Sequence, residues 1–450
     1  MSKPEARKSI EPVATPQPAR REPATLLANS AFMLLARGFT LLAGGALAVY
    51  AVRTFSVAAY GRYAVAAAIV TIFALLSEMG ISSYALRQMS HEDEPAGRTL
   101  GVALAAEAAT SVVAIALLVP IALVLGYSSD VIVLLAIGSG VLVFQSLLPP
   151  LEAAFKARRV MVYAASFGVV QAAVTAAAGF ALVAAGAGPV GLFVALLLGP
   201  AVALPTALVL LRSKLSITPT FSGAWRGVLP LLAASIPIAF TGAITAIYER
   251  VDVLMVSKLD SSEAAAIYAV PLTVLQYALL VPAIIGTSFF PLLTTTFRAD
   301  APAARSLFFL VSRLFVFVSA PITILLIGSG DRIVTVLFGA RYQESGEVLM
   351  LLSWSVVLGF QVFLLWYGLL GAYRERGMVA LMLAGLAFNV ALNAILIPTY
   401  GVKGAAISLV LSDLLILAGQ ALLRTATCLR FRTPRSSSDR SSPARSQRRC

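Results

Sequence analysis

The chain has 450 residues, of which 59% are hydrophobic and only 12% are charged, and its mean hydropathy is +0.90. A soluble domain cannot bury that much apolar surface, and the apolar runs are continuous rather than alternating, so soluble folds and outer-membrane barrels are excluded. The formal net charge is +13, but most Lys and Arg lie in the tails and in alternate loops, which favours membrane topology over nucleic-acid binding. With one histidine and two cysteines, Cys428 and Cys450, we expect no metal site, no cofactor and no disulfide framework.

Twelve apolar runs follow a polar N-terminal stretch. Residues 1–25 contain Pro, Glu, Lys and Arg but no apolar run, which predicts a disordered cytoplasmic tail. No cleavable signal peptide is predicted, because the first apolar run begins late and is full length. The predicted membrane spans fall near residues 27–50, 63–85, 100–125, 131–150, 161–185, 189–211, 230–256, 264–292, 306–328, 346–370, 378–397 and 402–424.

The Lys and Arg residues between the runs predict the orientation of the chain. Loops after even-numbered runs contain twelve of them and loops after odd-numbered runs contain six, and both tails are basic. The positive-inside rule therefore puts both termini in the cytoplasm, which an even number of spans requires. Residues 213–229 are predicted to form a cytoplasmic linker, and the Ser/Arg-rich residues 425–450 a disordered basic cytoplasmic tail.

Three short segments recur in the same order in the two halves. They pair 53–65 (R-T-F-S-V-A-A-Y-G-R-Y-A-V) with 258–270 (K-L-D-S-S-E-A-A-A-I-Y-A-V), 154–159 (A-F-K-A-R-R) with 372–377 (A-Y-R-E-R-G), and 188–191 (G-P-V-G) with 401–404 (G-V-K-G). The offsets are 205, 218 and 213 residues, which agree within the length of a loop. Six runs separate matching segments, so the two halves share one orientation and form a parallel repeat.

The predicted fold is an all-α polytopic membrane protein with two six-helix bundles, residues 26–212 and 230–424, that face each other across a cleft. The stretch 245–295 favours transport as the task of this fold. Glu249, Arg250 and Asp252 lie close together near the outer end of the seventh run, although a charge at the centre of a bilayer costs about 3 kcal/mol. The eighth run contains three prolines, which remove backbone donors and bend helices.

Four segments resemble known proteins. They are A-Y-G-R-Y-A-V…L-L-S-E-M-G-I-S-S-Y-A-L-R (59–87), R-V-D-V-L-M-V-S-K-L…I-Y-A-V (250–270), V-L-F-G-A-R-Y (336–342) and N-V-A-L-N-A-I-L-I-P-T-Y-G-V-K-G-A-A-I-S (389–408). In this order, on a twelve-span chain, they resemble polysaccharide-unit (O-antigen-unit) flippases of the multidrug/oligosaccharidyl-lipid/polysaccharide exporter superfamily.

The resemblance implies a bacterial inner-membrane protein that moves a polyprenyl-diphosphate-linked oligosaccharide from the cytoplasmic to the periplasmic leaflet by alternating access. It also implies a cationic cavity for the diphosphate and sugars. The expected partners are the lipid-linked oligosaccharide, membrane lipids and the polysaccharide polymerase machinery, and no nucleic acid.

Three arginines are candidates for substrate contact. Arg37 lies about ten residues into the first run, roughly 15 Å deep, and its guanidinium suits a diphosphate; the alternative is an ion pair with Glu107. Arg250 points away from Glu249 along the helix, so it faces the cavity or pairs across helices; the alternative is a hydrated interfacial charge cluster. Arg313 lies about seven residues into the ninth run, within reach of the cytoplasmic surface.

Acidic and amide side chains within the runs form a second group of candidates. Glu107, Glu249, Asp252 and Asp413 are candidates for ion coupling or ion pairs. Gln171, Thr175, Asn389 and Asn393 occupy matching positions in runs 5 and 11. They are candidates for a sugar path, and polar pairing between helices explains them equally well.

Three other functions compete with the flippase. A multidrug/toxin cation antiporter would carry an acidic residue in the first run, whereas residues 27–50 contain Arg37 and no Asp or Glu. A lipid II flippase usually has fourteen spans, and this chain has twelve. A polyprenyl-dependent membrane enzyme would need a sizeable external loop or a carboxylate pair outside the membrane, which the short external loops do not offer, so we do not expect an enzyme.

Overall fold

A computed structural model describes residues 23–90, 95–299, 301–371 and 375–430, and all regular elements in these ranges are helical, as predicted. The first half contains α1 (Pro23–Thr54), α2 (Val57–Glu78), α3 (Ile81–Met89), α4 (Ala96–Val124), α5 (Ser129–Ser146), α6 (Leu148–Ala157), α7 (Met161–Ala184) and α8 (Gly188–Leu215). The second half contains α9 (Ala224–Tyr248), α10 (Val251–Leu259), α11 (Ser262–Ala299), α12 (Ala301–Phe338), the 3₁₀ turn η1 (Ala340–Tyr342), α13 (Glu344–Leu352), α14 (Trp354–Gly371), α15 (Glu375–Tyr400) and α16 (Val402–Arg430).

The predicted number of membrane spans is confirmed for the described residues. Twelve helical segments have the length and hydropathy needed to cross a bilayer. Six of them precede the segment 216–223 and six follow it. The predicted tails lie largely outside the described residues, although α16 continues to Arg430 and so includes the first residues of the predicted C-terminal tail.

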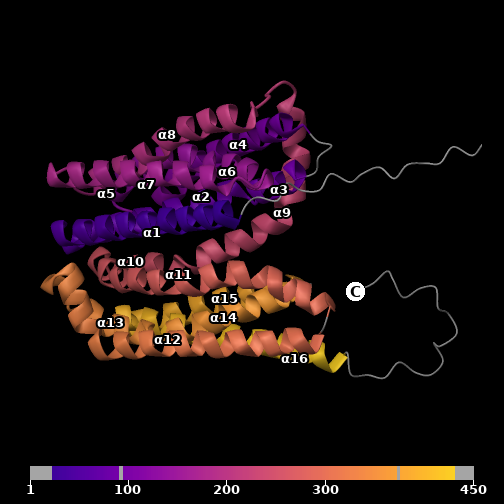
Figure 1. Ribbon diagram of the computed structural model, residues 1–450. Helices are drawn as coiled ribbons and strands as arrows, with labels where there is room; N and C mark the ends of the chain where they lie inside the picture. The colour runs from indigo at the N-terminus through magenta and orange to yellow at the C-terminus, as the bar shows by residue number, and fades with distance from the viewer. Residues whose placement is uncertain (1–22, 91–94, 300, 372–374, 431–450) are drawn as a thin grey trace, which may run out of the picture.

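The helices form two lobes that face each other along the length of the molecule (Figure 1). Helices α1 to α8 make up the upper lobe in this view and α10 to α16 the lower lobe. Helix α9 packs against α2 and α4 of the first lobe and against α15 of the second, so it joins the lobes as well as beginning the second half. The lobes also meet where α2 packs against α11.

Four of the spans are interrupted. The second breaks at Met79 and Gly80, whose φ angles of 42° and 68° are left-handed, so the helix stops there and restarts as α3. The fourth is divided into α5 and α6, the tenth into α13 and α14, and the seventh into α9 and α10. The run predicted at 230–256 is therefore two helices, although no proline lies at its break between Tyr248 and Val251.

Large apolar side chains fill the interior of both lobes and the contact between them. One cluster of buried side chains crosses the lobe contact and includes Val65 of α2 and Tyr268 of α11. A second cluster, with Leu100 of α4 and Phe155 of α6, fills the first lobe near the end where α3 and α6 pack together. The lobes are therefore packed bodies, and the hydrophobic core continues across the contact of α2 with α11.

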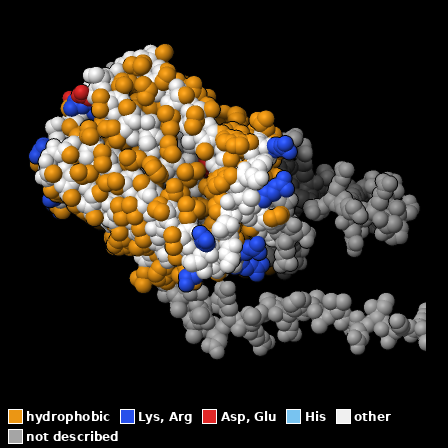
Figure 2. Space-filling model, turned by 90° about the horizontal axis from the view of Figure 1, so that it is seen from above, with side chains coloured by type: hydrophobic (Ala, Val, Ile, Leu, Met, Phe, Trp, Pro, Cys, Tyr) orange, Lys and Arg blue, Asp and Glu red, His pale blue; other side chains and the backbone are white. Residues whose placement is uncertain are grey.

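The outer surface has the pattern expected of a protein surrounded by lipid. Hydrophobic side chains cover the middle of the face in Figure 2, and Lys and Arg lie toward the two ends. Helix α1 begins and α16 ends at the right-hand end of Figure 1. Both described ends of the chain thus lie on one side, as an even number of spans requires.

Candidate functional site

A cavity of about 1300 Å³ lies between the lobes. Its walls come from α1, α2 and α5 to α8 of the first lobe, and from α10, α11 and Arg250 of the second. The lining extends to Met33, Lys156 and Met161, which lie near the end of the molecule where α1 begins. At the other end it stops at Ala51, Tyr60 and the break before α10, so the cavity ends before the loops that follow the odd-numbered spans.

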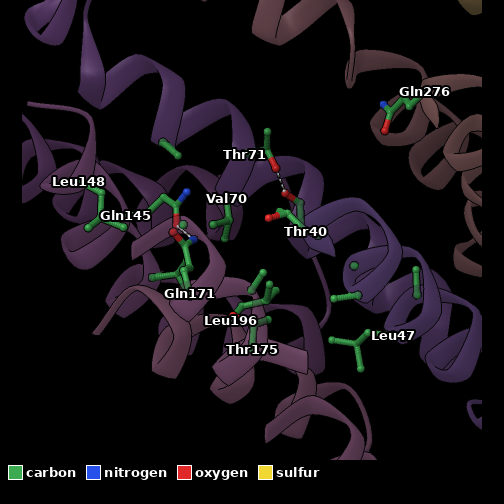
Figure 3. Close-up of a pocket in the computed structure, with 18 of the residues that line it drawn as sticks. Thr40, Leu47, Val70, Thr71, Gln145, Leu148, Gln171, Thr175, Leu196 and Gln276 are labelled. Carbon is green, nitrogen blue, oxygen red and sulfur yellow. Dashed lines mark hydrogen bonds between the residues drawn. The ribbon is translucent and has the colours of Figure 1, made fainter. Parts of the chain in front are cut away.

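Amide side chains mark the polar part of the cavity wall (Figure 3). The Nε2 atom of Gln171 on α7 donates a hydrogen bond of 3.1 Å to Oε1 of Gln145 on α5. Gln276 of α11 lies on the opposite side, on the second lobe. Three amides on two facing walls offer both donors and acceptors, which suits a ligand with many hydroxyl groups.

Threonines add hydroxyl groups along the same wall. Thr40 donates to the carbonyl of Ala36 at 3.0 Å and Thr71 to that of Ala67 at 2.7 Å, so their protons are used within their own helices. Their oxygen atoms remain able to accept from a ligand. Thr175 of α7 also lines the cavity, next to Gly199 of α8.

Two arginines provide the unpaired positive charge of the cavity. Arg37 of α1 is exposed into it, and Arg250 lies half-buried at the break between α9 and α10. Within the described part of the chain neither arginine forms an ion pair. The other cation in the lining, Lys156, is neutralised by Glu152 at 2.8 Å. Glu78 also lines the cavity and accepts a hydrogen bond from Ser82.

The break in the seventh span gives Arg250 its position. The Arg250 amide bonds to Ile247 at 3.1 Å, which tightens the chain into a 3₁₀-type turn before α10 restarts at Val251. The Nε atom of Arg250 is buried and has no hydrogen-bond partner in the described structure. A broken helix beside a cavity can present polar groups to a ligand without an open backbone facing lipid.

The structure does not bring every predicted cation to the cavity. Arg313 of α12 is exposed and is not among the residues that line it. Arg37 is not paired with Glu107, because both carboxylate oxygens of Glu107 are buried without a hydrogen-bond partner in the described part of the chain. Glu107 is fully buried in α4 and does not line the cavity, while Glu249 is exposed at the helix break.

The predicted sugar-path residues divide between two places. Gln171 and Thr175 line the cavity. Asn389 and Asn393 of α15 do not, because they are fully buried inside the second lobe. Their register on α15 turns both side chains toward Asp252, so the matching position in the repeat does not produce a matching environment.

Asp252 is the centre of a buried polar network in the second lobe. Its two carboxylate oxygens accept from Nδ2 of Asn393 at 2.6 Å and from the hydroxyl of Tyr268 at 2.9 Å. Asn393 also donates to Oδ1 of Asn389 at 3.0 Å. A second acid, Asp413 of α16, accepts from the hydroxyl of Tyr248 at 2.7 Å. Both acids accept hydrogen bonds from neutral donors, and neither forms an ion pair with a cation among the described residues.

Sequence reasoning missed Gln145, Gln276 and Lys156 as lining residues. The two glutamines interrupt long apolar runs, and that signal could have identified them, because a polar side chain within a membrane span usually faces the interior of the protein. Lys156 offers no such signal, since it lies at the end of α6 in a segment that reads as a loop.

Sequence comparison gives one family. A family model described as "Polysaccharide biosynthesis protein" matches residues 51–347. A search of curated protein sequences found no match.

Comparison with solved structures shows a shared fold. An inward-facing multidrug resistance MATE family transporter of the MOP superfamily is similar over 88% of this chain and 96% of its own, with a TM-score of 0.72 and 14% identity. The lipid II flippase MurJ in an inward closed conformation is similar over 89% of this chain and 87% of its own, with a TM-score of 0.68 and 14% identity. A MOP superfamily transporter from Pyrococcus furiosus is similar over 91% of this chain and 96% of its own, with a TM-score of 0.67 and 13% identity.

Proposed function

Because the chain belongs to the polysaccharide biosynthesis protein family and has the fold of MOP superfamily transporters, we propose that it is a flippase for polyprenyl-diphosphate-linked oligosaccharide units. It turns these units from the cytoplasmic to the periplasmic leaflet of a bacterial inner membrane by alternating access. Its termini lie in the cytoplasm, and the products serve a surface polysaccharide such as O-antigen, capsule or exopolysaccharide.

The observation that carries this proposal is the character of the cavity. Its volume of about 1300 Å³ exceeds the 300–1,000 Å³ typical of sites for drug-sized ligands, so it suits a larger headgroup. Arg37 and Arg250 supply charge for a diphosphate, and a guanidinium can bind phosphate oxygens bidentately. Gln171 and Thr175, with Gln145 and Gln276, supply hydrogen bonds for the sugars.

Energy coupling is assigned to the second lobe. Asp252 and Asp413 take up the driving ion, a proton or sodium, because they are acids inside a membrane domain that no cation neutralises among the described residues. Glu107 of α4, in the first lobe, is a further proton-binding candidate, as a buried carboxyl group without a hydrogen-bond partner among the described residues. Glu249, which is exposed, is assigned a structural place at the helix break.

Two other functions compete with this proposal: a multidrug/toxin cation antiporter and a lipid II-type flippase. The antiporter is disfavoured because the two acids in the cavity lining, Glu78 and Glu152, already have partners, whereas Arg37 and Arg250 form no ion pair among the described residues. An excess of unpaired positive charge attracts an anionic ligand and repels a cationic one.

Complementation tests the proposal. A bacterial strain without its own oligosaccharide-unit flippase receives the wild type, Arg37→Ala or Arg37→Lys at matched expression, and surface polysaccharide is measured. We expect the wild type to restore surface polysaccharide, Arg37→Ala to fail to restore it, and Arg37→Lys to restore part of it. Full activity of Arg37→Ala would remove Arg37 from the anion path. A gain of resistance to cationic drugs without restored polysaccharide would identify an antiporter instead.

A further inference from the structure

Beyond the end of the cavity near Ala51 and Tyr60, cations reach from one lobe to the other and hold the lobes together. The Nε atom of Arg53, in the last turn of α1, donates to the carbonyl oxygen of Leu337 at 2.8 Å, and its Nη2 atom donates to that of Val336. Both carbonyls belong to the last turn of α12 in the second lobe. The last carbonyls of a helix have no partner within the helix and carry the negative end of its dipole, so a guanidinium suits this place.

Lys258 makes the same kind of contact in the opposite direction. It lies in the last turn of α10, and its Nζ atom donates to the carbonyls of Leu125 at 2.7 Å and Gly126 at 3.1 Å. These carbonyls follow the end of α4 in the first lobe. The ammonium group also lies 3.7 Å from the ring centroid of Tyr127, a cation–π contact.

The internal repeat relates these two contacts. Arg53 opens the segment 53–65 and Lys258 opens its counterpart 258–270, at an offset of 205 residues. Their acceptors end the third and the ninth spans, which are also counterparts. The parallel repeat therefore produces the same contact twice. In each case, a cation at the end of the first span of one half binds carbonyls at the end of the third span of the other half.

Two further contacts close the same end. The Nη1 atom of Arg341, in η1, donates to the carbonyl of Phe55 at 3.4 Å, just after α1. A Cβ atom on Gly61 of α2 would lie 1.8 Å from the carbonyl oxygen of Ser262, the first residue of α11. The two helices thus touch backbone to backbone, which only a glycine at position 61 permits.

We propose that Arg53 and Lys258 form the two halves of an outer gate that holds the lobes closed at this end while the cavity is open at the other. Both side chains are exposed, so water can replace each contact when the gate opens. The contacts must break in every transport cycle. The inference rests on the alternating-access part of the proposed function and on nothing about the cargo.

Spin-label distances test the gate without any substrate. The background carries Cys428→Ser and Cys450→Ser, and the protein is placed in lipid nanodiscs. An outer pair of labels is attached through Ser129→Cys and Gln343→Cys, and an inner pair through Arg158→Cys and Ser306→Cys; all four positions are exposed.

We expect Arg53→Gln/Lys258→Gln to raise the outer-open population about tenfold, with longer outer and shorter inner distances, because two contacts between lobes are lost. Each single variant should give part of the shift. Arg62→Gln is the matched control, since Arg62 lies at the same end but pairs with Asp130 of its own lobe at 3.4 Å. It should leave both distances unchanged.

Unchanged distances in the double variant and in both single variants would overturn the gate, and so would an equal shift in Arg62→Gln. If the double variant does not purify as a monodisperse protein, the single variants decide by the same criterion. If the distances respond to the gate variants while no lipid-linked oligosaccharide is moved, the gate stands and the proposed cargo falls. If the lipid-linked oligosaccharide is moved but the distances do not respond to the gate variants, the proposed cargo stands and the gate falls.

Discussion

The amide of Asn393 on α15 donates a hydrogen bond of 2.6 Å to Oδ1 of Asp252 on α10, and both side chains are buried. This bond joins α10, the second part of the divided seventh span, to α15, the eleventh span. A hydroxyl from Tyr268 holds the other carboxylate oxygen. Helix α10, which begins at the helix break beside the cavity, is therefore anchored within the second lobe by Asp252. This acid has no cationic partner among the described residues.

Removing the amide should destabilise this lobe. Asn393→Leu leaves Asp252 with one donor fewer in a buried place, and a lost hydrogen bond to a charged group costs about 1.5–3 kcal/mol. We expect a lower midpoint of thermal unfolding for the purified protein in detergent. Thr399→Val serves as the control. Thr399 is exposed on the same helix, and its hydroxyl donates to backbone carbonyls of that helix. Equal midpoints for Asn393→Leu and the wild type would contradict the role of this bond.

Removing only the charge should affect coupling more than stability. Asp252→Asn keeps the shape of the side chain but cannot take up a proton or neutralise a cation. We expect transport in proteoliposomes to lose its dependence on an imposed proton or sodium gradient. The matched control is Glu249→Gln, an exposed acid three residues earlier in the chain. If Asp252→Asn still responds to the gradient as the wild type does, the driving ion binds elsewhere.

Arg250 and Arg313 provide a direct comparison of two arginines. Arg250 lines the cavity and Arg313 does not. The loss of one charge-assisted bond to a phosphate is worth about 1.5–3 kcal/mol, so Arg250→Gln should lower the transport rate about tenfold to a hundredfold at low substrate concentration. Arg313→Gln should transport at the wild-type rate. Equal rates for the two variants would show that the cavity does not bind its ligand through Arg250.

Close packing of α7 on α8 gives a test of the fold itself. A Cβ atom on Gly199 would lie 1.9 Å from Oγ1 of Thr175, so Gly199→Ala must push the helices apart. Overpacking of this kind costs about 1–3 kcal/mol, and we expect a lower unfolding midpoint. Gly242→Ala is the control, because no described atom outside its own stretch of helix lies within 4 Å of a Cβ at that position. A fall of the same size in both variants would mean that the loss is not due to helix contact.

The sequence by itself determined the helical class, the twelve spans and the relation between the halves. Each of these depends on local composition: a run of about 20 apolar residues must form its backbone hydrogen bonds within itself, so it becomes a helix wherever it lies. The same reasoning selected Arg37, Arg250, Gln171 and Thr175, which the structure places along the cavity. A charged or polar side chain in an apolar run usually faces the interior, and in this fold that interior includes the cavity, although Arg313 does not follow the rule.

Only the tertiary structure decided which polar residues meet. Asn389 and Asn393 match Gln171 and Thr175 in the repeat, yet Asn393 donates to Asp252 and to Asn389 inside the second lobe, because the helix that faces them differs. Arg53 and Lys258 read as ordinary loop cations, and their acceptors lie 283 and 133 residues away in the chain. A backbone carbonyl carries no sequence signal, so a contact between a cation and the end of a distant helix becomes visible only when the two lobes are packed together.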